Sequence, residues 1–307
     1  MERFKVKFRG VRGSFPVADK KFLQYGGNTS CVEINAGEHV IILDAGTGIV
    51  KAGDELIEQY ISSSLETEKR TAINTAIFLS HIHQDHLLGL TFFKPIHIPN
   101  AEINIFGDGN EQSDLKENLS NLVFGKTFPL DIHEINCKLK IHNICDDYAV
   151  IFRPNSSPEL IKKDEICQQD DDVLVTFYKS YVHPQNGVMI YKISYKGKSV
   201  IYATDKECYF GGDKKFIRFA KNCDLLIHDA QYTSEDYMNP HSPKQGFGHS
   251  TYDMALEAMH QSNAKNLVFF HYEPSYDDVK LDRIKELYTS KEKNVYMAYE
   301  GFELNIE

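Results

Sequence analysis

The stretch from Ser80 to Gly89, with the sequence SHIHQDHLLG, constrains this chain more than any other part of its sequence. Three histidines and an aspartate fall within six residues, directly after the apolar run 75–79, which has the length of a buried strand. Polar side chains gathered at such a place are costly unless something binds them. Imidazole nitrogens and carboxylate oxygens are ligands for Zn²⁺ or Mn²⁺, and the lack of a nearby cysteine disfavours a closed structural site. We therefore predict a metal site here, in preference to a polar loop whose histidines face solvent.

Three later polar residues also end hydrophobic strands. His183, Asp205 and His271 each follow an apolar run, as His81 does. A two-metal site needs more than four protein ligands and an open position for water and substrate. Each of the three is, taken alone, more commonly an ordinary loop residue. Together with the first cluster they become candidate ligands.

The pattern of strands and helices predicts an α+β fold. Apolar and charged residues alternate over 4–11 as in an edge strand, and helices are expected over 48–63, 112–123, 251–262 and 277–291. Strands and helices in each half of the chain favour two sheets between helical layers, a four-layer αββα sandwich. No linker rich in proline, glycine and serine divides the sequence, so we expect one domain over residues 1–307.

The acidic stretch 146–172 is the least core-like part of the chain and is expected to be a variable insertion. A plain solvated segment is the commonest outcome for such a composition, while a lid or a dimer contact stays open. Asp44 also has two interpretations. It is either a turn residue that precedes a helix or a carboxylate that orients a histidine ligand.

The composition limits the classes of substrate and partner that we expect. The formal net charge of −10 argues against tRNA or duplex DNA, whose binding depends on Lys and Arg contacts to phosphate. We therefore expect a small phosphodiester substrate, no duplex nucleic acid and no membrane, with a homodimer left open. No apolar stretch approaches the length of a membrane span, and the six scattered cysteines indicate free thiols, so a cytoplasmic location is expected.

The string His81-x-His83-x-Asp85-His86 resembles the signature of the metallo-β-lactamase superfamily. The resemblance implies two divalent metal ions, with Zn²⁺ favoured over Mn²⁺. It implies that one ion is held by His81, His83 and His183. It implies that Asp85, His86 and His271 hold the other ion, and that Asp205 bridges the two.

Two further stretches, Asp224–Ala230 and Gly248–Thr251, are similar to a pair of motifs in the tRNA 3′-processing endonuclease (ribonuclease Z) and related cyclic phosphodiesterases. The resemblance implies that His249 is a general acid or a phosphate ligand and that Asp229 orients it. Asp229 stands where the processing enzymes carry glutamate, which is one methylene longer. The alternative is that Ser250 or Thr251 caps the following helix while His249 is exposed.

The resemblance thus implies a dinuclear metal-dependent hydrolase with Asp85, Asp229 and His249 as candidate catalytic residues. We expect a phosphodiesterase in which a metal-bridging hydroxide attacks a small, cyclic or linear, nucleotide or sugar phosphodiester and His249 protonates the leaving oxygen. The alternatives are a thioester or lactone hydrolase on the same fold, which would not need His249, and a metal-binding sensor without catalysis.

Overall fold

A computed structural model describes residues 4–109, 113–125, 128–209, 211–289 and 294–306. Its strands form two sheets of seven and eight strands. The order in the first sheet is β15 (Glu303–Asn305), β1 (Phe4–Gly10), β2 (Cys31–Ala36), β3 (His39–Leu43), β4 (Ile73–Phe78), β5 (Ala101–Gly107) and β6 (Lys138–Asn143). The order in the second is β14 (Val295–Met297), β13 (Leu267–Phe270), β12 (Leu225–Asp229), β11 (Lys198–Ala203), β10 (Val188–Tyr195), β9 (Val173–Ser180), β7 (Tyr148–Phe152) and β8 (Glu159–Lys162).

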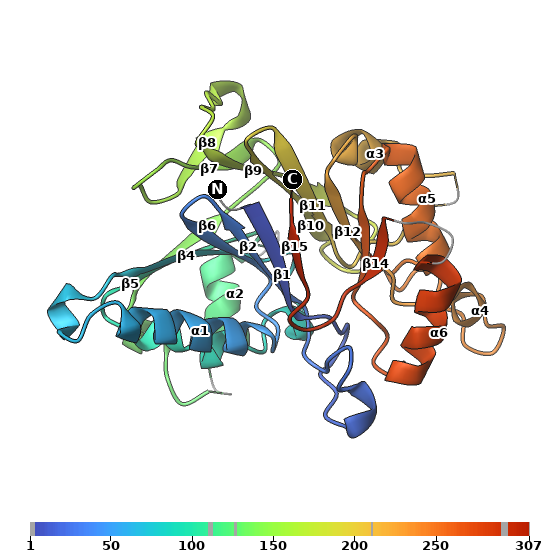
Figure 1. Ribbon diagram of the computed structural model, residues 1–307, viewed down its shortest axis with the longest axis horizontal. Coiled ribbons are helices and arrows are strands. Elements are labelled where there is room, and N and C mark those ends of the chain that lie inside the picture. The colour runs from blue at the N-terminus through green and yellow to red at the C-terminus, as the bar shows by residue number, and fades with distance from the viewer. Residues whose placement is uncertain (1–3, 110–112, 126–127, 210, 290–293, 307) are drawn as a thin grey trace.

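Helices cover the outer faces of the two sheets (Figure 1). The first sheet is covered by α1 (Ile49–Ser62) and α2 (Leu115–Leu122). The second is covered by α3 (Lys214–Ala220), α5 (Tyr252–Ser262) and α6 (Asp278–Thr289), while the short α4 (Ser234–Tyr237) lies beyond them. The predicted four-layer sandwich is confirmed. None of the helices in these described ranges combines the length and the apolarity that crossing a bilayer would require.

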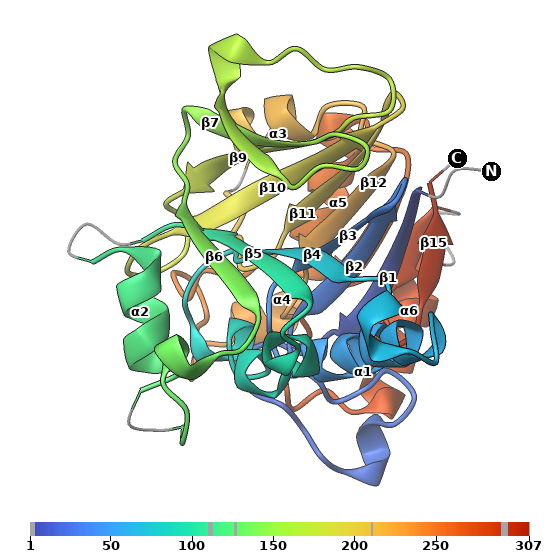
Figure 2. The ribbon, with the colours of Figure 1, turned by 90° about the vertical axis from the view of Figure 1, so that its left-hand side faces the viewer.

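The main core lies between the sheets, which face one another in Figure 2. Phe78 of β4 stacks on Phe106 of β5 with ring centroids 4.8 Å apart. The same Phe78 meets Tyr191 of β10 edge-on at 5.4 Å, so aromatic contacts join the two sheets directly. A second apolar cluster fills the space between the first sheet and α1 and α2. Successive side chains along a strand point to opposite faces of the sheet. The strands of the first sheet therefore contribute apolar side chains to both clusters.

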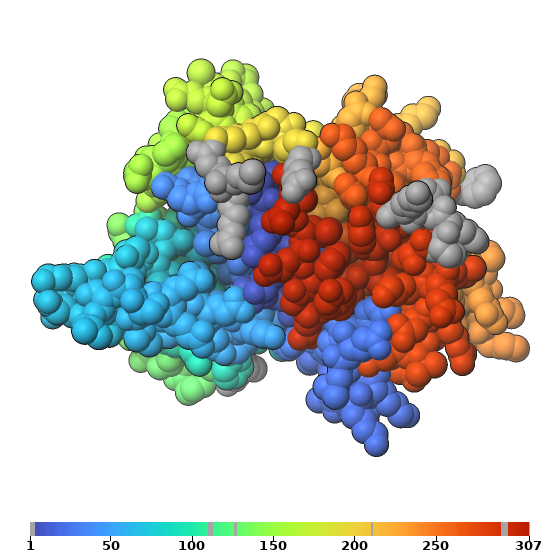
Figure 3. Space-filling view, in the orientation of Figure 1, coloured from blue at the N-terminus to red at the C-terminus, as the bar shows by residue number. Residues whose placement is uncertain are grey.

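The expectation that residues 4–11 form an edge strand is wrong, because β1 has a neighbour on each side. β15 pairs with it through Lys5–Asn305, Val6–Leu304 and Lys7–Glu303, and β2 pairs with its other edge. The space-filling view in Figure 3 shows the consequence, with red C-terminal segments lying against blue N-terminal ones. Local alternation can reveal a strand but carries no information on a partner almost 300 residues away.

The stretch 146–172 also differs from a plain solvated segment. It contributes β7 and β8 to the second sheet, and Val150 and Phe152 of β7 belong to the main core. The residues after β8 are largely exposed, as their charge predicts. Elsewhere, the segment after Gly89 forms two 3₁₀ turns, Leu90–Phe92 and Lys94–His97. Residue 112 and residues 290–291, included in two expected helices, lie outside the described ranges.

Candidate metal centre

The carboxyl ends of strands from both sheets meet at one site. In the first sheet β3 and β4 run parallel, so Asp44 and the loop from Ser80 leave the sheet side by side. In the second sheet β11, β12 and β13 run parallel, and Asp205, Asp229 and His271 stand at or just after their ends. Parallel strands place their carboxyl ends along the same edge, and crevices at this edge are the usual ligand sites of such sheets.

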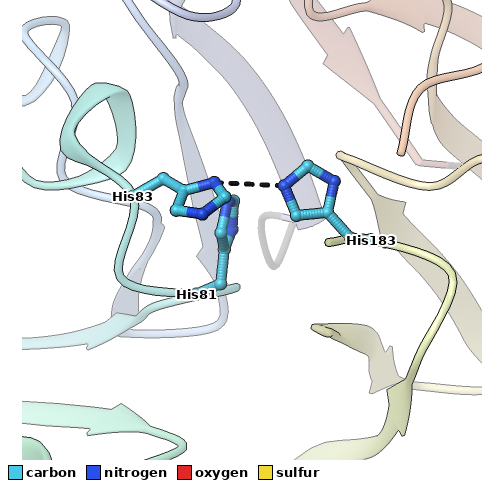
Figure 4. A group of neighbouring side chains, drawn as sticks. All are labelled: His81, His83 and His183. Atoms are coloured by element: carbon cyan, nitrogen blue, oxygen red, sulfur yellow. Dashed lines mark hydrogen bonds between the residues drawn. The ribbon is translucent and has the colours of Figure 1, made fainter. Parts of the chain in front are cut away.

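The first group of candidate ligands is His81, His83 and His183 (Figure 4). Two come from the loop after β4 and the third from the loop after β9. The His183 Nε2 lies 3.1 Å from the His83 Nδ1, and one nitrogen from each ring falls within 4.8 Å of the others. Three imidazoles pointing at one small volume have the arrangement of ligands around a cation.

The second group is Asp85, His86, Asp205 and His271, all of them buried. The His86 Nε2 lies 3.1 Å from the Asp205 Oδ2 and 3.2 Å from the Asp85 Oδ2. The His271 Nε2 lies at the same two distances from the same two oxygens. Two carboxylates and two imidazoles thus face one point.

Asp205 lies between the two groups and turns a different oxygen to each. Its Oδ2 faces the second group, as described, whereas its Oδ1 lies 3.7 Å from the Nε2 atoms of both His81 and His183. A carboxylate with one oxygen toward each of two donor clusters has the geometry needed to bridge two cations.

The backbone is strained at three residues whose side chains point into the site. Asp44, Asp205 and His271 have φ values of 63°, 50° and 65°, in the left-handed region that residues other than glycine rarely adopt. Each such residue costs about 1–3 kcal/mol and persists only when its surroundings hold it in place. Strain gathered at three strand ends around one point is typical of a functional site.

The donor atoms fit cations. The Nε2 atoms of His81 and His86 are buried and make no hydrogen bond, which is a costly state for a polar atom unless it binds something else. Burial holds the pKa of His81 well below its ordinary value and lowers the pKa of His183 to about 4, so both rings are neutral near pH 7. Neutral imidazoles and carboxylates form a donor set suited to Zn²⁺ or Mn²⁺.

Neighbouring polar groups fix the ligand rings. The buried Asp44 accepts a 2.7 Å hydrogen bond from the His86 Nδ1, which leaves the Nε2 free to face Asp205. Asp44 is held in turn by the Ser80 backbone N–H at 2.6 Å and by the Tyr202 hydroxyl at 2.7 Å. These contacts favour the orienting interpretation of Asp44 over a turn residue alone.

His249 and Asp229 are brought together beside the second group. The His249 Nδ1 lies 2.8 Å from the Asp229 Oδ2, so aspartate reaches the ring despite being shorter than glutamate. Burial alone would lower the pKa of His249, but the charge and hydrogen bond of Asp229 raise it to about 9. The His249 ring stacks on His271 with centroids 5.1 Å apart. Thr251 does cap α5 at the Met254 N–H, yet His249 is buried, so the alternative of an exposed histidine is wrong.

Two neighbours of the site had no signal in the sequence. The Ser14 backbone N–H donates to the Asp85 Oδ2 at 2.8 Å, although a turn after β1 gave no reason to place it there. Glu207, two residues after Asp205, accepts hydrogen bonds from the backbone of Gly246 and Gly248. His228 is also buried, and it contacts Cys208 and the Asp229 carbonyl.

Comparisons with known proteins identify the family and the fold. A family model described as the beta-lactamase superfamily domain matches residues 39–272. A Ribonuclease Z from Picrophilus torridus is 27% identical, with the alignment covering 99% of this chain and 96% of that protein. Two solved structures share the fold. The metallo-beta-lactamase fold protein YhfI from Bacillus subtilis (18% identity, TM-score 0.64) covers 99% of this chain and 100% of its own. The short form of human tRNase Z (16% identity, TM-score 0.61) covers 99% of each.

The expectation of a small phosphodiester substrate in place of a nucleic acid is wrong. A relative that matches along 99% of the chain is named Ribonuclease Z, and a structure with the same fold is a tRNase. The error has a physical cause. The net charge of −10 sums over the entire surface, whereas contact with phosphate depends on the few cations near the reacting group. An acidic total is therefore a poor guide to what reaches a metal centre.

Proposed function

The chain belongs to the beta-lactamase superfamily, and from this premise we propose that it is a ribonuclease with a dinuclear metal centre. It is a metal-dependent hydrolase that acts on phosphodiester bonds, as its relatives named Ribonuclease Z support. The proposal adds an RNA substrate and two ions. The observation that carries the second ion is the placement of the two Asp205 oxygens, one toward each group of ligands.

One ion would be held by His81, His83 and His183, and the other by Asp85, His86 and His271, with Asp205 shared between them. Neutral imidazoles favour Zn²⁺, while Mn²⁺ fits the carboxylates. When bound, such ions supply positive charge to the phosphoryl oxygens and lower the pKa of water. They would also supply the local positive charge that the acidic protein surface lacks.

The chain's own residues manage the proton at the leaving group. Asp229 holds the His249 Nδ1 and leaves the Nε2 proton to be donated to the departing ribose oxygen. Asp229 is itself fixed by the backbone N–H groups of Ser250 at 2.8 Å and Asp205 at 3.1 Å. The carboxylate therefore cannot swing away from the imidazole, and one network joins the proton donor to the bridging position.

The test combines metal analysis with RNA cleavage. Purified protein should contain about two equivalents of metal per chain, and Asp205→Asn should lower that number and abolish cleavage of a precursor tRNA transcript. Glu102→Gln, at the opposite end of the first sheet, serves as control and should change neither. One equivalent of metal in the active protein would refute the dinuclear centre. No cleavage of tRNA or other RNA by fully loaded protein would refute the ribonuclease, and hydrolysis of thioesters or lactones instead would favour the alternative.

A further inference from the structure

The loop that leads into His249 carries two side chains that the proposed chemistry does not use. We infer that Phe247 and Lys244 form a nucleotide subsite beside the metal centre, in which Phe247 stacks on a base and Lys244 contacts a phosphate. The inference rests on the proposed function, since it describes how the same site would hold the nucleotide next to the scissile bond.

Phe247 is held in an exposed position. Its residue is 51% exposed, although a phenylalanine gains from burial. It stands between Gly246 and Gly248, whose φ values of 83° and 90° suit glycine and would strain any other residue. The backbone on both sides of Phe247 thus adopts a conformation that favours glycine.

A buried carboxylate holds this loop in place through hydrogen bonds. Glu207 is 8% exposed and accepts hydrogen bonds from the Gly246 N–H at 2.8 Å, the Gly248 N–H at 2.9 Å and the Tyr237 hydroxyl. Burial of a carboxylate is costly unless hydrogen bonds compensate for it, and here three groups do so. The loop is therefore fixed, so the aromatic ring of Phe247 is presented to solvent in advance of any ligand.

The loop that carries Phe247 runs next to the centre. The Gly248 carbonyl accepts a 3.2 Å hydrogen bond from the Nδ1 of the candidate ligand His183. Its neighbour along the chain is His249, the candidate proton donor. Phe247 therefore lies two residues from the candidate proton donor, on a loop that contacts a candidate metal ligand.

Lys244 adds a cation to the same place. Its Nζ lies 5.4 Å from the Phe247 ring centre and 5.9 Å from that of Tyr232, whose ring is 6.0 Å from the His249 ring. The Nζ donates to the Ser242 hydroxyl at 3.2 Å, and among the described residues no carboxylate pairs with it. By contrast, Lys179 near His81 is neutralised by Asp108. Lys244 is thus a cation available for a phosphate.

A purely intramolecular contact between Lys244 and Phe247 explains the exposed position of Phe247 less well than a ligand does. An exposed contact between Lys244 and Phe247 is worth little compared with a base stacked on an aromatic ring. Aromatic faces and lysines along a groove are how proteins hold single-stranded nucleotides without reading their sequence. The subsite should therefore accept any base.

The chain has no tryptophan, which allows a direct test of stacking. Phe247→Trp introduces the chain's single tryptophan, which can be excited at wavelengths where tyrosine does not absorb. Adenosine 5′-monophosphate should quench its fluorescence, while ribose 5-phosphate, which lacks a base, should not. Leu65→Trp is the control. Leu65 is fully exposed beyond the far end of α1, a 14-residue helix about 21 Å long. Equal quenching by both ligands, or none, would overturn the stacking role.

Kinetics separate the two side chains. Phe247→Ala should raise the KM for a short RNA about 5- to 100-fold, with little change for RNA that is abasic beside the cut. Lys244→Gln should weaken binding of both RNAs alike and reduce the slope of log affinity against log salt by about 0.7. Lys138→Gln is the matched control, because Lys138 of β6 is already paired with Glu102 of β5. If wild-type protein cleaves RNA but Phe247→Ala leaves its KM unchanged, the subsite is wrong and the ribonuclease stands.

If wild-type protein cleaves no RNA, the proposed function fails, while the monophosphate titration still reports on the subsite.

Discussion

At the scale of single residues, the centre depends on groups that hold the ligand rings as much as on the ligands. Ser80 contacts the Nδ1 of His81 at 3.0 Å, and Asp44 contacts that of His86 at 2.7 Å. In each ring the other nitrogen is left facing the site. Fixing the tautomer and orientation of a histidine in this way commonly changes metal affinity 10- to 100-fold.

Asp44 provides the first prediction. Asp44→Asn should lower metal affinity about 10- to 100-fold, because an amide is a weaker acceptor for the His86 N–H. Competition with a chelator measures this directly. Asp54→Asn, which removes a surface partner of Lys94, is the control. Asp44→Gly separates the two interpretations, since glycine accepts the φ of 63° but offers no carboxylate. Wild-type affinity in that variant would mean that Asp44 is only a turn residue.

His249 provides the second prediction. His249→Asn should lower kcat for RNA about 10²- to 10⁴-fold, the usual contribution of a general acid. The loss should be much smaller for bis-p-nitrophenyl phosphate, because nitrophenolate leaves without needing a proton. Bound metal, measured in parallel, should stay constant. An equal loss on both substrates would instead identify His249 as a phosphate ligand.

At the scale of helices and strands, the sequence was most informative where an apolar run ended in a polar residue. The ends of β4, β11 and β13 could be located this way, and with them His81, Asp205 and His271. Convergence could not be derived from pattern alone, since it depends on parallel pairing between β11, β12 and β13. The resemblance to a known family supplied the grouping that local reasoning left open.

The elements that were missed have physical reasons as well. The helix α3 has only seven residues, too few to establish a helical period. β7 lies in a stretch with an acidic composition, which masked its buried residues. Glu207 and Ser14 act through backbone hydrogen bonds to distant segments, and no side-chain pattern along the chain records such contacts.

An ion pair between a helix and the first sheet provides the third prediction. Arg9 of β1 is buried and pairs with Glu33 of β2 and Glu55 of α1. The hydrogen bond from Arg9 lowers the pKa of Glu55 to about 2. Because the folded pKa lies below the unfolded value of about 4.3, the stabilisation is present above pH 5 and is lost as pH falls toward 2.

Glu55→Gln should therefore lower the free energy of unfolding at pH 7 by about 1 kcal/mol, a value reduced by the partial exposure of the carboxylate. The deficit relative to wild type should shrink as the pH falls below 5. Urea unfolding at several pH values measures it. Glu58→Gln, exposed on the next turn of α1, is the control. A deficit that stays constant with pH would show that packing, not charge, is responsible.

At the scale of the whole molecule, the centre joins the two sheets. His81, His83, Asp85 and His86 follow β4 in the first sheet, whereas His183, Asp205 and His271 follow strands of the second. A cation bound between them would add a link across the main core. Ions that bind only the folded chain stabilise it by about 4 kcal/mol when their concentration is a thousand times the Kd.

Removal of metal should therefore lower the Tm, and the stability of the metal-free protein should itself depend on pH. Burial lowers the pKa of His183 to about 4, below the ordinary 6.5, so the unfolded metal-free chain binds more protons between these values. The stability of chelated protein should then rise as pH increases from about 4 to 6.5. Calorimetry with and without chelator tests this. Asp205→Asn is the control, because a variant without the carboxylate that would be shared between the two ions should bind less metal and respond less to chelation. An unchanged Tm after verified removal of metal would mean that the two sheets hold the seven side chains in place unaided.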